Sequence, residues 1–278
     1  MGTTDMKTFY ADDTYLKSNK TEPMPRIHML GGFVVDTAEE ASLIGKIRLL
    51  KRRYTHPNMP IKWNFKDGSI KEVYERFERV TEYQEMLKES YAWRKDLAAV
   101  VAESKVRIVV ACIEAYSETK DIIKESKPDL LQYLFENVLM RLALDASETK
   151  EHWQCVLDWP PSGESSPFDK AYYPVFHYGK TINDVTVNAG SLEPLGFSHS
   201  LLYARCNHSP LLQLADVIVG AARDHLEAVM QQRTECLGTE MVQLMKPKFR
   251  SVGGKIAGYG VVASGGNRDL RAAIEKAF

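Results

Sequence analysis

The amino-acid sequence predicts an α/β fold in which a mixed central β-sheet is flanked by helices. Apolar, β-branched segments typical of strands alternate along the chain with segments whose apolar residues recur at the helical period. The first two strand-like segments follow each other without a helix between them, as in an antiparallel pair. The chain has 278 residues, enough for a substantial core, and it shows no internal repeat or obvious linker. We therefore expect one α/β domain over residues 1–278.

The predicted sheet begins with the segments MKTFYADD (6–13) and RIHMLGGFVVD (26–36). The first is expected to be a strand that ends in two aspartates, and the second a strand interrupted by Gly31 and Gly32. A polar, proline-containing loop at 17–25 joins them in this interpretation.

A helix is expected next, at 36–54, where Thr37 and Glu40 have the spacing of a capping box. The short segment MPIKWNF (59–65) follows, with Lys62 at its centre.

Ser69 and Glu72 repeat the capping-box spacing and open a helical stretch, broken or continuous, from about 70 to 102. We interpret residues 64–104 as a helical insertion. The apolar run KVRIVVACIEA (105–115) then predicts a central strand.

The second half of the chain predicts an amphipathic helix at 127–146 and a strand at 152–159. A flexible loop at 160–170 and a last strand at 199–205 are expected after them.

The segment SPLLQLADVIVGA (209–221) predicts a buried helix with Ser209 as its N-cap and Pro210 in its first position. The glycine-rich C-terminal extension at about 230–278 is expected to be irregular, apart from a short final helix that begins near 268.

Charge and composition exclude some classes of protein. The net charge is −1, so the chain does not hold nucleic acid by bulk positive charge, and any such contact needs a local patch or a partner subunit. No apolar run is long enough to span a bilayer and the N-terminus has no signal pattern, so we expect a cytoplasmic protein without membrane contact. Its four cysteines form no CxxC pair and are interpreted as reduced, buried thiols.

Aspartates occupy places where a site is expected. Asp12 and Asp13 end the first strand, Asp158 ends a later strand, and Asp216 lies in the apolar helix. Carboxylates at strand ends can meet at one edge of a sheet, where Mg²⁺ or Mn²⁺ would offset their repulsion. The alternative for Asp216 is a structural pair with a buried arginine or a nearby loop.

The same helix places Gln213, Asp216 and Gly220 on one face. The glycine would let that face approach another backbone or a substrate closely.

Five motifs in this order, FYADDTYL, LGGFVVD, IKW, VLDW and SPLLQLADVIVGA, resemble the Domain of Unknown Function 3800 family. The resemblance extends over roughly residues 6 to 228, and the last motif is the most specific. It implies a ribonuclease H-like fold and a nuclease that uses Mg²⁺ or Mn²⁺. Many members of that family occur near mobile elements and phage-defence genes.

Matched motif by motif, these residues take the roles that the resemblance implies. Catalytic roles are implied for Asp12, Asp158, Asp216 and Lys62, and metal ligation for Asp12, Asp13, Asp158 and Asp216. Asp13 stands where the family usually has glutamate, and its side chain is one methylene shorter.

Substrate contacts are predicted for Gln213 and for His208, which precedes the helix that contains Asp216. They are also predicted for Arg52 and Arg53, which belong to the basic segment 46–57. The alternative is an exposed loop histidine and a solvated basic face.

The leading hypothesis is hydrolysis of a DNA or RNA phosphodiester by metal-activated water. One alternative is an inactive ribonuclease H-like module that binds nucleic acid, a partner protein or a second copy of the chain. Another is a metal-dependent phosphatase or nucleotide hydrolase that acts on small substrates.

Overall fold

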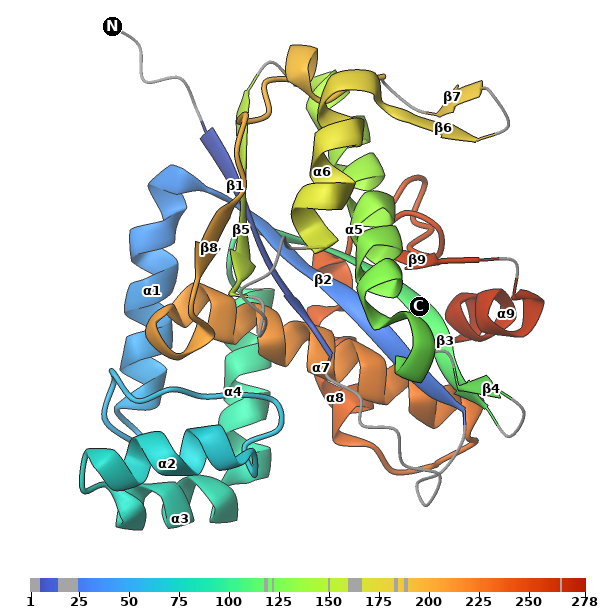
Figure 1. Cartoon of the computed structure of the whole chain (residues 1–278). Helices are drawn as coiled ribbons and strands as arrows, with labels where there is room; N and C mark the ends of the chain where they lie inside the picture. Colours follow the sequence, from blue (N-terminus) through green and yellow to red (C-terminus); the bar gives the residue numbers. More distant parts are fainter. Residues whose placement is uncertain are drawn as a thin grey trace, which may run out of the picture.

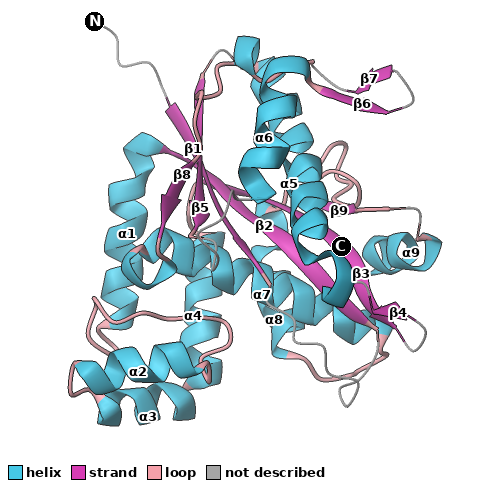
Figure 2. Cartoon of the chain, viewed as in Figure 1, coloured by secondary structure: helices cyan, strands magenta, loops and turns pink. Residues whose placement is uncertain are grey.

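The computed structural model describes residues 6–14, 25–117, 120–121, 123–149, 151–159, 167–182, 185–187, 190–265 and 267–278. Within them a mixed β-sheet is flanked by helices, which confirms the predicted α/β class (Figures 1 and 2). The strands are β1 Met6–Asp13, β2 Arg26–Asp36, β3 Val106–Ser117, β4 Lys120–Asp121, β5 His152–Asp158, β6 Lys180–Ile182, β7 Val185–Val187, β8 Leu202–Ala204 and β9 Val261–Ala263.

The α-helices are α1 Thr37–Lys51, α2 Gly68–Arg76, α3 Val80–Lys88, α4 Ser90–Ala102, α5 Ile123–Glu148, α6 Pro167–Tyr178, α7 Pro210–Met230, α8 Leu237–Met245 and α9 Arg268–Ala277. Three short 3-10 helices are η1 Glu193–Leu195, η2 Cys206–His208 and η3 Lys246–Lys248. The predicted loop at 17–25 lies almost entirely outside the described residues.

The main sheet has the strand order β4-β3-β2-β1-β5-β8, and β9 also pairs with β3. The strands β1, β2 and β3 are antiparallel in turn, whereas β5 runs parallel to β1 and β8 runs parallel to β5. The sheet is therefore mixed, as predicted. The prediction that 199–205 holds the last strand was wrong, because β9 from the C-terminal extension joins the sheet beside β3.

The strand β2 continues through Gly31 and Gly32, so the predicted interruption was wrong. A Cβ added at Gly31 would lie 2.3 Å from the carbonyl oxygen of Val109, and one added at Gly32 would lie 1.9 Å from that of Tyr10. The two glycines thus allow β2 to approach both neighbouring strands closely.

Both predicted capping boxes were wrong, because neither Thr37 nor Ser69 is the N-cap of its helix. Asp36 precedes α1, and the Thr37 hydroxyl instead donates to the Met6 carbonyl on β1. Asp67 caps α2 by accepting from the backbone N–H of Ser69, so Ser69 is inside the helix. In each case the N-cap position is held by an aspartate before the predicted cap, but only Asp67 caps its helix with its side chain, as Asp commonly does.

Three helices, α2 to α4, occupy the stretch where one broken helix was expected, while 59–65 forms neither helix nor strand. The expected loop at 160–170 is helical from Pro167, where α6 begins. The C-terminal extension contains α8 as well as the predicted α9.

The sheet carries apolar clusters on both faces. On one face α7, α1 and the helices α2 to α4 bury side chains such as Phe33 and Ile108. On the other, α5 and α6 cover Phe9, Ala11 and Leu30. Burial of apolar surface on both faces is the main stabilising contribution to such a layered fold.

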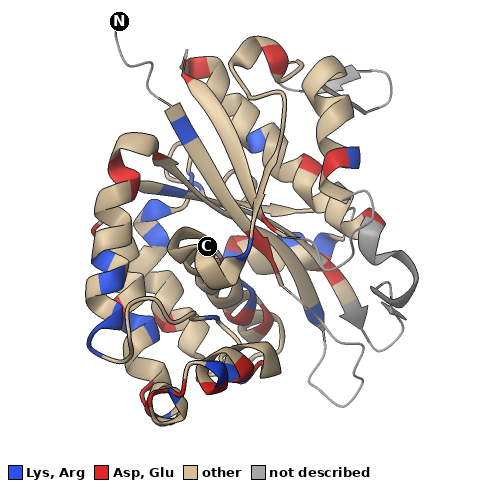
Figure 3. Cartoon of the chain, turned by 60° about the vertical axis from the view of Figure 1, so that its left-hand side comes forward, with Lys and Arg blue, Asp and Glu red and all other residues tan. Residues whose placement is uncertain are grey.

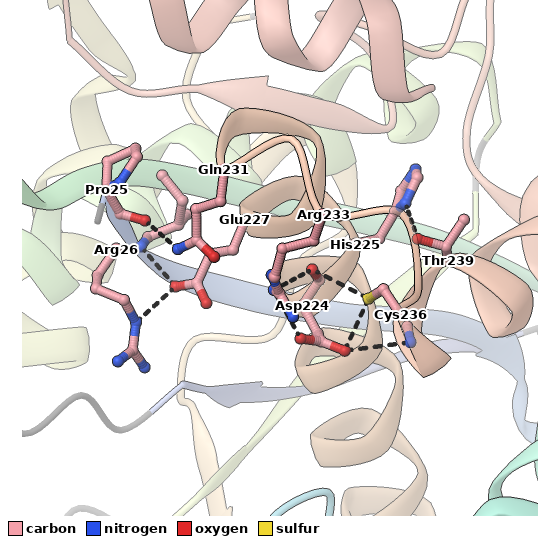
Figure 4. Close-up of polar contacts among 11 residues, drawn as sticks. Pro25, Arg26, Asp224, His225, Glu227, Gln231, Arg233, Cys236 and Thr239 are labelled. Atoms are coloured by element: carbon pink, nitrogen blue, oxygen red, sulfur yellow. Dashed lines mark hydrogen bonds and ion pairs between the residues drawn. The ribbon is translucent and has the colours of Figure 1, made fainter. Parts of the chain in front are cut away.

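The helix α7 has the predicted beginning, since the Ser209 hydroxyl accepts from the backbone N–H of Leu212. Its other end is fixed by polar contacts (Figure 4): Glu227 accepts from the backbone N–H of Ile27, at 2.9 Å, and from Nε of Arg26. These contacts tie α7 to the start of β2 and make it a rigid support for the residues that it presents.

All four cysteines are free, and Cys112, Cys155 and Cys206 are buried as predicted. The prediction was wrong for Cys236, which is only partly buried. Among the described residues, no helix has both the length and the apolar character that crossing a membrane requires.

Candidate metal centre

Two of the predicted site residues meet because their strands are parallel neighbours. Ala11 of β1 lies opposite Leu157 of β5, and the next residue on each strand is Asp12 and Asp158. Both aspartates therefore lie at the carboxyl ends of adjacent strands, where α/β proteins commonly form their sites.

The chain then returns to the same place through β8. Ala204 pairs with Asp158, and two residues later the backbone N–H of Cys206 donates to Asp158 Oδ1 at 2.7 Å. One ligand atom each from Asp12, Asp158 and Cys206 lies within 4.8 Å of the other two. Cys206 was not among the predicted site residues.

Asp216 approaches this group from α7. Its Oδ2 accepts a hydrogen bond from the backbone N–H of Trp63. Burial raises the pKa of Asp216 to about 6, although the Trp63 N–H and the positive charge of Lys62 both oppose the rise. Asp216, for which the sequence left a metal and a structural pair as alternatives, therefore accepts a hydrogen bond from a backbone donor and lies near the positive charge of Lys62.

The three carboxylates act on one another electrostatically. Burial, followed by the charges of Asp216 and Asp158, raises the pKa of Asp12 well above its usual range. Burial also raises the pKa of Asp158. Such a concentration of buried negative charge is unfavourable without a cation, and a divalent ion would reverse the effect.

The arrangement of oxygen atoms fits a divalent ion. Each carboxylate uses one oxygen to accept a backbone N–H: Asp12 from Asp13, Asp158 from Cys206 and Trp159, and Asp216 from Trp63. Among the described residues, no donor bonds to the second oxygen of any of the three. Oriented carboxylates with an oxygen to spare are the ligands that Mg²⁺ and Mn²⁺ prefer.

Lys62 lies within the influence of all three carboxylates, as predicted. Burial alone would lower the pKa of Lys62, but the surrounding negative groups, Asp216, Asp12 and Asp158 among them, raise it. Lys62 is therefore a cation held at the edge of the carboxylate group.

The segment 59–65, which contains Lys62, is held against α7 by contacts along its length. Lys51 Nζ donates to the Met59 carbonyl at 2.9 Å, and the Ile61 N–H donates to Gln213 Oε1 at 3.4 Å. Arg94 of α4 donates to the Trp63 carbonyl. This irregular segment is therefore positioned by side chains from α1, α4 and α7.

Gln213 is 2% exposed and uses both ends of its amide. Its Oε1 accepts from Lys51 Nζ and from the Ile61 N–H, and its Nε2 donates to the Cys206 carbonyl at 2.9 Å. These bonds give Gln213 a positioning role, because they join the ends of α1, the segment 59–65 and η2. Its predicted contact with substrate stays a prediction.

Gly220 permits the close approach that the sequence suggested. A Cβ added there would lie 2.2 Å from Cγ of Trp63, so the indole occupies the space that a side chain would need.

The remaining predicted residues lie farther from the group. Asp13 follows Asp12 on β1, so its side chain points to the opposite face, where its Oδ2 is 3.6 Å from His28 Nε2. Arg53 pairs with Asp96 at 2.8 Å, and Arg52 and His208 are exposed. No contact between described residues joins these three to the carboxylates.

Among the described residues, Lys and Arg positions occur along α1, and Asp and Glu positions occur near the centre of the molecule as well as around its periphery (Figure 3).

The sequence analysis missed the residues that hold the site together: Cys206, Lys51 and Arg94. Lys51 is 2% exposed, and burial lowers its pKa to about 7. The sequence offered one weak signal, the position of Cys206 directly after the last predicted strand at 199–205; nothing local marked the other two.

Comparison with known protein families, with curated proteins and with solved structures finds no match.

Proposed function

We propose that this chain is a divalent-metal-dependent hydrolase of nucleic-acid phosphodiesters with a ribonuclease H-like fold. The observation that carries the proposal is the convergence of Asp12, Asp158 and Asp216 from β1, β5 and α7. These are three of the four positions at which the family resemblance implies metal ligands; the fourth is Asp13.

In this proposal the spare oxygens of Asp12 and Asp158 hold Mg²⁺ or Mn²⁺, with Asp216 as the further acidic ligand. A bound divalent ion supplies a nucleophilic water at neutral pH and neutralises charge on the phosphate. Lys62 contacts a non-bridging phosphate oxygen as a point charge, since the carboxylates keep it protonated.

An exposed aromatic side chain beside the site supports a nucleic-acid substrate. Trp159 directly follows Asp158, donates its backbone N–H to Asp158 Oδ1 at 3.0 Å, and is 53% exposed. Its indole packs edge-on against Tyr203, with ring centroids 6.0 Å apart. One indole face at the mouth of the site would stack on an unpaired base.

The proposal is tested by calorimetric titration with Mn²⁺ and Mg²⁺, and by cleavage assays on single- and double-stranded DNA, RNA and free nucleotides. The parent chain should bind Mn²⁺ and cleave at least one polymer. Asp158→Asn should lose both properties.

The matched control is Asp169→Asn, which neutralises an exposed aspartate in the first turn of α6 and should leave both properties unchanged. Absence of metal binding by the parent chain would contradict the proposal and favour an inactive binding module. Cleavage restricted to nucleotides would favour a small-molecule hydrolase.

A further inference from the structure

The sulfur of Cys206 is the unexpected member of the candidate metal centre. Cys206 is 3% exposed, and within the described residues its Sγ takes part in no hydrogen bond. The sulfur nevertheless lies in the same 4.8 Å group as ligand oxygens of Asp12 and Asp158. Asp12 is itself only 9% exposed and keeps one oxygen without a donor from the described residues.

Backbone contacts on both sides fix the position of this thiol. The Cys206 N–H donates to Asp158 Oδ1 at 2.7 Å, and its carbonyl accepts from Gln213 Nε2 at 2.9 Å. Gln213 is in turn held by Lys51 from α1. The sulfur is thus placed by the same network that positions a predicted ligand, Asp158.

The other buried cysteines are placed differently. Cys112 donates its thiol to the Val262 carbonyl at 3.6 Å. Cys155 lies on β5 three residues before Asp158 and packs into the apolar cluster beneath α5 and α6. Cys112 and Cys155 thus have ordinary structural surroundings, whereas the sulfur of Cys206 lies within 4.8 Å of oxygens from two carboxylates.

We propose that Cys206 is a metal ligand and that its sulfur makes this centre favour a thiophilic divalent ion, such as Zn²⁺, over Mg²⁺. Thiolate sulfur selects zinc and similar ions, while an all-oxygen site suits magnesium. On binding, the metal–sulfur bond forms as the S–H bond breaks, and the proton passes to solvent. The inference rests on the metal centre of the proposed function and is independent of the hydrolytic reaction.

Co²⁺ is the probe, because a cobalt–thiolate bond produces an intense charge-transfer absorption in the near ultraviolet that oxygen ligands do not give. The parent chain should develop this band with saturation at one or two equivalents of Co²⁺. Cys206→Ser should bind without the band, and Cys155→Ala should keep it.

Zn²⁺ and Mn²⁺ affinities measured by competition provide a second readout. Cys206→Ser should weaken Zn²⁺ binding by at least the roughly 10–100-fold that follows loss of an outer-shell partner. Its affinity for Mn²⁺ should change much less. Cys206→Ala serves the same purpose if the serine variant does not fold, as judged by circular dichroism without metal.

The outcomes separate this inference from the proposed function. Binding of Mn²⁺ and Co²⁺ without the band in the parent chain would overturn the role of Cys206 and leave the carboxylate centre intact. A band that depends on Cys206, in a chain that cleaves no nucleic acid, would support the ligand and contradict the nuclease. Failure to bind any of these ions would overturn both.

Discussion

Gly220 of α7 lies directly against the indole of Trp63: a Cβ built on the glycine would be 2.2 Å from Cγ of that ring. The same Trp63 donates its backbone N–H to Asp216, one turn earlier on α7. The glycine therefore sets the distance between the helix and the segment that contains Lys62.

Gly220→Ala is expected to destabilise the chain. Alanine normally stabilises a helix interior by about 0.5–1 kcal/mol relative to glycine, but here the methyl group must displace a tryptophan, at a cost of about 1–3 kcal/mol. Urea denaturation measures the net loss. Metal affinity should fall as well, because Trp63 carries the donor to Asp216.

Gly45→Ala is the matched control. Gly45 is also inside a helix, α1, but it is exposed and an added Cβ would meet no atom within 4 Å. This variant should be slightly more stable than the parent chain. Equal effects of the two substitutions would contradict the packing argument.

Asp216→Asn is expected to stabilise the metal-free chain at pH 7. The unfolded carboxyl ionises near its usual pKa of 3.8, whereas the folded one ionises at about 6. Between these values the folded state binds more protons, so stability falls as pH rises and the full cost remains above pH 6. Asparagine removes that cost, on the order of 1–3 kcal/mol, and can still accept the Trp63 N–H.

The measurement is thermal unfolding with a chelator present, from pH 4 to pH 8. The advantage of the variant should shrink toward pH 4, and saturating Mn²⁺ should stabilise the parent chain more than the variant. If the parent chain is the more stable of the two at pH 7 without metal, the charge of Asp216 does not destabilise the metal-free fold and the prediction is wrong.

Lys51→Met is expected to remove an increase in stability with pH, the opposite of the decrease that Asp216 causes. Burial lowers the pKa of Lys51 to about 7, below its usual 10.5, so the unfolded chain binds more protons between these values. The parent chain should therefore gain stability as pH rises from about 7 to about 10.5, relative to the variant. Urea denaturation from pH 6.5 to pH 9.5 gives both slopes, and parallel slopes would show that folding does not lower the pKa of Lys51.

Much of the fold could be predicted because its strands and the helix α7 have strong local patterns. The bounds of β1 and β2 agree with the predicted segments, and Ser209 begins α7 as expected. The helix α6 was missed because it follows a Pro- and Ser-rich stretch and contains Pro174, features typical of loops. Its aromatic face is stabilised by tertiary packing, which a local pattern does not reveal.

The site was predictable only in part, for a similar reason. Asp12, Asp158 and Asp216 follow apolar segments, so their position in the fold could be inferred from the order of elements. The contacts of Cys206 and Gln213 depend on a turn after β8 and on Lys51, which is 162 residues from Gln213 in sequence. No periodicity within a single element encodes such a bond.

Trp159→Ala is expected to weaken binding of single-stranded oligonucleotides. If the exposed indole stacks on a base next to the scissile phosphate, its removal should cost about 1–3 kcal/mol, or roughly a 5- to 150-fold rise in Kd. Fluorescence anisotropy in metal-free buffer measures binding without cleavage. Trp159→Phe should recover most of the affinity, because phenylalanine also offers an aromatic face.

The control is Tyr178→Ala, which removes another exposed aromatic ring, 71% accessible, at the end of α6. The ring of Tyr178 packs against His177, and no contact between described residues joins it to Asp158, so its loss should leave Kd unchanged. An equal loss of affinity in both variants would indicate nonspecific adsorption to aromatic surface. An unchanged Kd for Trp159→Ala would mean that the base beside the scissile bond lies elsewhere, even if the carboxylates bind metal as proposed.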